Sequence, residues 1–195
     1  MVALSAFEGL AVSVALPEVA AALGNVGRLP WVITAYLLTS GVATVAAGAL
    51  LDQFGVRPVF RGAVSVFTVG GVLAGLAPTM HTLIAARVLQ GIGAGAINAV
   101  GLASVGLVFP RHLVGRAFAA NTTVWGVMSV GGPGLAALLV AFASWRWIFL
   151  VNLPLGALAL WMGWSALPQR REGPRTPTRL RVSELVGLTA IVACV

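Results

Sequence analysis

Six long apolar stretches, separated by short breaks, are the feature that most constrains how this chain can fold. Each is close to the roughly 20 apolar residues that a helix needs to cross a lipid bilayer. They occupy Met1–Leu23, Trp31–Leu51, Val59–Leu76, Thr82–Phe109, Ala117–Phe142 and Trp147–Leu167. Charged residues make up only 9% of the chain, whereas soluble domains carry roughly 25%. The sequence therefore predicts an all-α membrane protein, a bundle of six transmembrane helices, and excludes a soluble globular domain.

The two ends of the chain suggest a piece of something longer. The first stretch starts at residue 1 and contains Glu8, and no basic segment precedes it, so a spanning helix is favoured over a signal peptide. A seventh apolar run, Leu185–Val195, is too short to span a membrane. We expect a six-helix unit over 1–167, a basic loop over 168–184 and the start of a truncated seventh helix over 185–195.

Arginine placement predicts the orientation in the membrane, since the chain has no lysine. If the N-terminus is cytoplasmic, the cytoplasmic side holds nine arginines, the outer side holds two, and Arg87 lies within the fourth stretch. The nine are Arg57, Arg61, Arg111, Arg116, Arg170, Arg171, Arg175, Arg179 and Arg181. The positive-inside rule then places the N-terminus and the loop Gln169–Glu184 in the cytoplasm. The expected location of the chain is the plasma membrane. The net charge of +7 is thus explained by topology, and nucleic acid is not an expected partner.

Tryptophans are expected to form belts at the two faces of the membrane. Trp31, Trp145 and Trp147 fall at the predicted outer interface, and Trp161 and Trp164 fall near the inner one.

Two charged residues, Glu8 and Arg87, lie well inside predicted spanning helices. Glu8 has apolar neighbours on both sides, and a charge at that depth normally faces a cavity or a partner. Arg87 is followed at helical spacing by Gln90 and Asn98, which puts all three on one face of the fourth helix. We expect Glu8, Arg87, Gln90 and Asn98 to point into the bundle. The alternatives are a shallow Glu8 near the cytoplasmic face and an Arg87 that reaches the outer interface; Glu18 is expected to be solvated.

No pattern for catalysis or cofactor binding is found. The single cysteine, Cys194, and the two histidines, His81 and His112, are far from any matching carboxylate or nucleophile. The glycine-rich run at 91–95 follows no strand and lacks the lysine of a phosphate-binding loop, so it indicates close helix packing. The chain is predicted not to be an enzyme and to need no cofactor.

The connection between the second and third helices carries a recognisable motif. The stretch from Gly48 to Arg57 resembles the signature loop of the major facilitator superfamily, Gly-x-Leu-Ala-Asp-Arg-x-Gly-Arg-Lys. Gln53 and Val56 replace two of its basic positions. The residues that match are Gly48, Asp52, Gly55 and Arg57.

Further stretches resemble the same family in the same order. Residues 83–94 resemble its helix-four motif, with Arg87, Gln90 and the glycines in register. Gly132-Pro133 resembles the core of its antiporter motif, although Ala136 and Ala137 replace the closing glycines. Residues 145–156 and 8–17 resemble helix six and helix one of the fourteen-helix drug:proton antiporter branch, with Glu8 in place of an aspartate.

The resemblance implies a fold, an activity and a set of partners. The family folds as two six-helix bundles around a central cavity, and this chain would supply the N-terminal half, with helices one and four lining the cavity. The implied function is proton-coupled export of drugs or metabolites by alternating access, driven by the proton gradient. The lipid bilayer, a small-molecule substrate and the missing C-terminal half are the implied partners, and Asp52 with Arg57 would latch the halves together. Uptake of a specific solute and a non-transporting scaffold or truncated gene product remain as alternatives. The composition favours a bacterial source.

Overall fold

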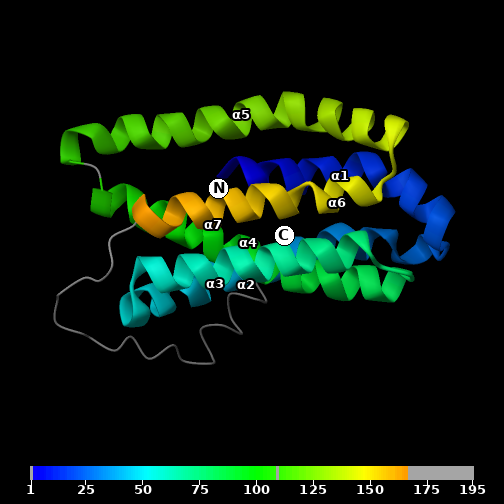
Figure 1. Cartoon of the computed structure of the whole chain (residues 1–195), viewed down its shortest axis with the longest axis horizontal. Helices are drawn as coiled ribbons and strands as arrows, with labels where there is room; N and C mark the ends of the chain where they lie inside the picture. Colours follow the sequence, from blue (N-terminus) through cyan, green and yellow to red (C-terminus); the bar gives the residue numbers. More distant parts are fainter. Residues whose placement is uncertain (1, 109, 167–195) are drawn as a thin grey trace.

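The computed structural model describes residues 2–108 and 110–166, and they form a bundle of long helices lying side by side (Figure 1). The loop and seventh helix predicted for 168–195 lie outside the described residues. The elements are α1 (Val2–Leu23), a 3-10 turn η1 (Val26–Arg28), α2 (Leu29–Phe54), α3 (Val56–Gly75), α4 (Met80–Val108), α5 (Arg111–Phe142), α6 (Arg146–Leu150) and α7 (Asn152–Ala166).

Within the described residues, six helical segments are long and apolar enough to cross a membrane, which confirms the predicted fold class. They are α1, η1 with α2, α3, α4, α5, and α6 with α7. At 1.5 Å per residue, the 26 residues of α2 extend for about 39 Å, beyond the roughly 30 Å hydrocarbon core. The helices therefore reach into the headgroup region, and arginines that the sequence assigns to loops, such as Arg111 and Arg116, lie in their first turns.

The sixth predicted helix is broken in two. Residues 146–150 form α6, Val151 occupies a turn, and Asn152 begins α7. Pro154 has no N–H to donate to the carbonyl of Leu150, one turn earlier, so the helical hydrogen-bond ladder is interrupted at this point. The break makes Asn152 the first residue of a new helix.

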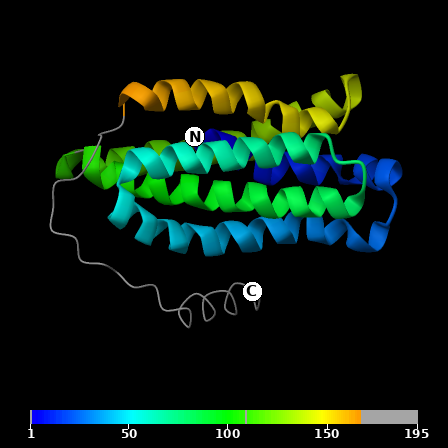
Figure 2. The same cartoon turned by 60° about the horizontal axis from the view of Figure 1, so that its bottom comes forward.

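Helix α4 lies at the centre of the arrangement, between α2 on one side and α3 on the other (Figure 2). Glycines make this approach possible. A Cβ added to Gly93 would lie 2.6 Å from Cα of Phe67 on α3, and a Cβ on Gly95 would lie 2.8 Å from Cβ of Ala43 on α2. Both distances are too short for real atoms, so any side chain at these positions would push the helices apart. The close packing predicted for the glycine-rich run is confirmed.

The remaining helices cover the central three. Helix α5 packs along α1, and α7 packs on α3 (Figures 1 and 2). A buried apolar cluster joins α1 to α4, α5 and α6, with Phe7, Val12, Leu83 and Ile148 among its members. Glu8, which follows Phe7 of this cluster along α1, is fully buried.

Of the five predicted belt tryptophans, three are exposed and one is buried, and the side chain of Trp164 lies outside the described residues. Trp31, Trp147 and Trp161 are exposed, as an interfacial position requires. Trp145 is instead buried at 3% exposure, with its ring edge-on to Phe149 at a centroid distance of 6.1 Å. Its prediction as a belt residue was wrong because the short helix α6 turns its ring into the apolar core.

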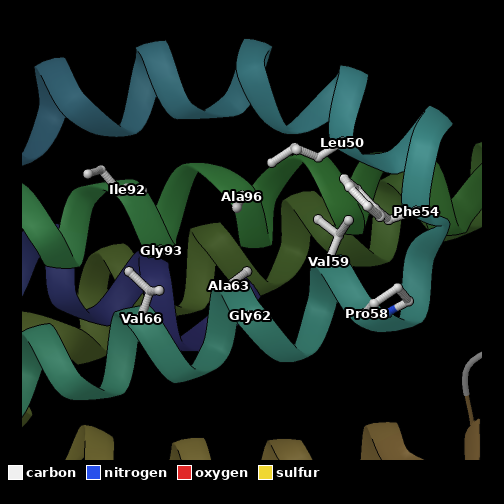
Figure 3. Close-up of a pocket in the computed structure, with 10 residues that line it drawn as sticks. All are labelled: Leu50, Phe54, Pro58, Val59, Gly62, Ala63, Val66, Ile92, Gly93 and Ala96. Carbon is white, nitrogen blue, oxygen red and sulfur yellow. The ribbon is translucent and has the colours of Figure 1, made fainter. Parts of the chain in front are cut away.

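An apolar groove of about 290 Å³ lies between α2, α3 and α4 (Figure 3). Its walls are hydrophobic side chains and glycines. The lining residues are Leu50, Phe54, Pro58, Val59, Gly62, Ala63, Val66, Ile92, Gly93 and Ala96. None of the predicted site residues lines this groove, so the polar site is elsewhere.

Candidate functional site: a buried charge cluster

Glu8 and Arg87 form an ion pair inside the bundle. Arg87 Nη1 on α4 donates to Glu8 Oε1 on α1 at 2.8 Å. Glu8 is completely buried and Arg87 is 1% exposed. Paired charges are what a low-dielectric interior tolerates, because an isolated charge there would lose its solvation without compensation. Two sequence-predicted site residues, 79 positions apart, are thus in direct contact.

The guanidinium of Arg87 has further partners on α2 and on its own helix, α4. Nε donates to the carbonyl oxygen of Val32 at 3.1 Å, and Nη1 donates to Gln90 Oε1 at 2.7 Å. The ring of Tyr36 lies 4.0 Å from the guanidinium carbon, close enough for a cation–π contact. Arg87 therefore points into the bundle, and the alternative in which it reaches the outer interface does not describe this structure.

The second carboxylate oxygen of Glu8 is held by Asn152. Asn152 Nδ2 donates to Glu8 Oε2, so each oxygen of the carboxylate has a donor from a different helix. The position of Asn152 follows from the break before α7, which starts the helix at this residue. Glu8 is consequently fixed from α4 on one side and from α7 on the other.

Glycines on α3 leave room for the backbone that carries Gln90. A Cβ on Gly70 would lie 2.6 Å from the backbone nitrogen of Gln90, and a Cβ on Gly71 would lie 3.3 Å from Gln90 Nε2. Gln90 is fully buried, and its side-chain oxygen is taken by Arg87. The opposite charges of Glu8 and Arg87 thus neutralise each other within a small polar pocket, which apolar side chains surround.

Asn98, the fourth predicted residue, lies apart from this cluster. It is on the same helix as Arg87 but 11 residues further on, which is about 16 Å along an α-helix. Its Oδ1 accepts from Ser5 Oγ at 3.3 Å, linking α4 to α1 at a second level. Glu18 is exposed, as expected.

The signature connection between α2 and α3 is shorter than the predicted loop. It consists of Gly55 alone, with φ of +82°, a left-handed conformation that favours glycine. Asp52 lies in the last turn of α2 and is exposed, and Arg57 is the second residue of α3 and is half-buried. Gly48 is half-buried on α2. The loop assignment of Asp52 and Arg57 was wrong because the helices continue almost to the turn.

The family described as Major Facilitator Superfamily matches residues 1–193. The chain belongs to the major facilitator superfamily.

Relatives within the superfamily are longer than this chain. It is 41% identical over 164 residues to a putative multidrug resistance protein, MdtD, of Cronobacter sakazakii, covering 82% of this chain and 35% of that protein. It is 40% identical over 161 residues to an uncharacterised transporter of the same superfamily from Mycobacterium tuberculosis, covering 83% of this chain and 23% of that protein. The chain thus spans about a third or less of the length of these relatives.

A solved structure confirms the fold. The inward-open xylose transporter XylE of Escherichia coli superimposes with a TM-score of 0.72 over 98% of this chain and 54% of that protein, at 15% sequence identity. At that identity the likeness concerns the fold alone. It shows that the six helices have the arrangement of part of a major facilitator transporter.

The antiporter-like motif of the superfamily lies in α5. Gly132 is buried, and a Cβ there would be 3.8 Å from the ring of Phe7 on α1, an ordinary contact. Pro133 lies inside α5, where it removes one backbone hydrogen bond. The motif therefore lies where α5 meets α1, against Phe7, the residue that precedes Glu8.

Sequence reasoning missed two side chains of the cluster, Tyr36 and Asn152. Both are uncharged polar residues inside long apolar stretches, so a criterion extended from charged to polar side chains would have found them. Asn152 was part of the stretch that resembles helix six, but no role was assigned to it. Tyr36 is 4% exposed, and Asn152 is fully buried.

Proposed function

We propose that this chain forms the proton-coupling half of an exporter of small lipophilic molecules in the plasma membrane, with its N-terminus in the cytoplasm. The observation that carries the proposal is the buried pair of Glu8 and Arg87 at the junction of α1, α2, α4 and α7. Titratable residues inside membrane helices commonly mark ion or proton pathways. The name of the Cronobacter relative, a putative multidrug resistance protein, supports drugs as the substrate class.

The geometry suggests how Glu8 would carry the proton. When Glu8 is ionised, Arg87 neutralises it within the bundle. When Glu8 takes up a proton from outside, the attraction between the two groups weakens, while Arg87 keeps its bonds to Val32 and Gln90. The two protonation states therefore stabilise different arrangements of α1 against α4. Alternating access follows if these arrangements expose the cavity to opposite sides of the membrane.

The second half of the transporter would complete the cavity and the latch. Asp52 is exposed at the end of α2, where a helix N-terminus from the other half would stabilise its charge. Arg57, Gly132 and Pro133 are further candidates for the contact surfaces that change during transport. Asn98 would line the cavity below the charge cluster.

The test uses the full-length transporter in proteoliposomes with an imposed pH gradient, and ethidium as the fluorescent substrate. Glu8→Gln keeps the shape of the side chain but cannot carry a proton, so it should abolish gradient-driven export while ethidium binding is retained. The matched control is Glu18→Gln, the same substitution on an exposed residue of the same helix, which should export at the parental rate. Gradient-dependent export by Glu8→Gln at the parental rate would refute the role of Glu8. Ethidium accumulation in the opposite direction would favour uptake over export.

A further inference from the structure

The side-chain amide of Asn152 uses its nitrogen in a hydrogen bond, but its oxygen has no hydrogen-bond partner among the described residues. Its Nδ2 donates to Glu8 Oε2, whereas its Oδ1 is buried and has no hydrogen-bond partner among the described residues. A buried acceptor without a donor is unfavourable by about 1–3 kcal/mol. Such an orphan in a native site calls for an explanation.

The protonation state of Glu8 changes what its neighbour must offer. An ionised carboxylate only accepts hydrogen bonds, so the Nδ2 of Asn152 suits it. A protonated carboxyl has an O–H that must donate, and a second donor pointing at that oxygen leaves the proton without an acceptor. Rotation of the Asn152 amide by half a turn about its last side-chain bond would present Oδ1 to Glu8 instead.

The other groups around Glu8 cannot make this exchange. Arg87 on α4 carries donors only. The amide oxygen of Gln90 already accepts from Arg87, so turning that amide would bring its NH₂ group against the guanidinium. Tyr36 on α2 faces Arg87 with its ring, and Arg146 on α6 donates to the carbonyl of Ala77. The titratable side chains of α5 in the described range, among them Arg111 and Arg116, lie in its first turns, far along the helix from Gly132.

We propose that Asn152 is the positioning residue of the proton-carrying carboxyl, donating through Nδ2 to ionised Glu8 and accepting through Oδ1 from protonated Glu8. A hydronium ion gives up one of its O–H bonds and becomes water, and its proton forms the new O–H bond at Oε2. This inference rests on the proposed function of Glu8 as the proton carrier. Asn152 begins α7 directly after the break at Val151. The exchange of its hydrogen bonds would therefore couple the protonation of Glu8 on α1 to the start of α7.

The first experiment is infrared difference spectroscopy, acid minus alkaline, on the full-length protein in lipid nanodiscs. The C=O stretch of protonated Glu8 should appear as a band that Glu8→Gln removes. In Asn152→Leu, which has a similar shape but no polar atoms, the band should move to higher frequency because the carboxyl has lost its acceptor. The control is Asn121→Leu, the same substitution at an asparagine on α5 whose Oδ1 is also buried with no hydrogen-bond partner among the described residues. It should leave the band in place.

The outcomes separate the two proposals. If no band is lost in Glu8→Gln, the proposed function of Glu8 fails. If Glu8→Gln removes the band but Asn152→Leu leaves it at the parental frequency, Glu8 remains the carrier and the role of Asn152 is refuted.

A second measurement needs no variant. In the parent protein labelled with ¹⁵N-asparagine, the side-chain amide signal of Asn152 should shift with the same pH midpoint as the Glu8 band. The chain supplies internal references in Asn25, Asn98 and Asn121, which do not contact Glu8 through any hydrogen bond in the structure. An Asn152 signal that stays constant through the Glu8 titration would overturn the proposal.

Discussion

Removing both members of the Glu8–Arg87 pair should destabilise the bundle about as much as removing either one alone. We compare Glu8→Leu, Arg87→Met and the double variant Glu8→Leu/Arg87→Met in a thermodynamic cycle. Each single change leaves one charge buried without its opposite, whereas the double change removes both charges. The expected result is strong non-additivity.

The magnitude follows from the contacts in the structure. Breaking a buried ion pair by removing one partner lowers the free energy of unfolding by about 3–5 kcal/mol. In the double variant no charge remains, but Asn152 Nδ2, Gln90 Oε1 and the carbonyl of Val32 lose the bonds that Glu8 and Arg87 made. Each such loss is unfavourable by about 1–3 kcal/mol. The double variant should therefore resemble either single variant, with a coupling free energy of about 3–5 kcal/mol.

The assay is reversible unfolding in mixed micelles, followed by tryptophan fluorescence as the fraction of denaturing detergent rises. Glu18→Leu is the matched control, because Glu18 is an exposed carboxylate on the same helix, and it should change the free energy of unfolding by no more than about 0.5 kcal/mol. Two single effects that add up in the double variant would refute the reasoning, since additivity means that the side chains do not interact.

Two further predictions concern packing and the signature motif. Gly95→Ala should lower the free energy of unfolding by about 1–3 kcal/mol, because its Cβ would collide with α2. Gly101 has open space around it, so Gly101→Ala should leave the free energy of unfolding unchanged. The same micelle assay measures both. Asp52→Asn should impair ethidium export, because this exposed residue is proposed to contact the other half of the transporter. Membrane insertion, measured by fractionation, should stay normal. Export at the parental rate would refute the proposed role of Asp52 as a latch.

The number and kind of helices could be predicted from the sequence because the requirement is local. A segment that crosses lipid must satisfy its own backbone hydrogen bonds and must be apolar along its whole length. Both conditions are visible in any 20-residue window, so all six spanning segments were found. Their ends were less accurate. A helix can extend beyond its apolar stretch. Helix α5, for example, begins at Arg111, six residues before the predicted start at Ala117.

The break before Asn152 shows what a hydropathy pattern leaves out. Residues 146–166 are apolar throughout most of their length, and the sequence predicted one continuous helix. Pro154 interrupts the hydrogen-bond ladder without changing the hydropathy, so the signal was in the residue type and not in the pattern. The burial of Trp145 has the same origin, because it depends on how the short α6 packs.

The candidate site divides along the same line. By itself the sequence determined that Glu8, Arg87 and Gln90 must face inward, because lipid cannot solvate them and their helical spacing assigns the face. It did not determine which of them meet. The tertiary structure joined Glu8 to Arg87 across 79 positions and to Asn152 across 144, and placed Asn98 at a different level. Contacts of that range depend on the rotation and separation of helices, which here the glycines of α3 and α4 set through close packing with their neighbours.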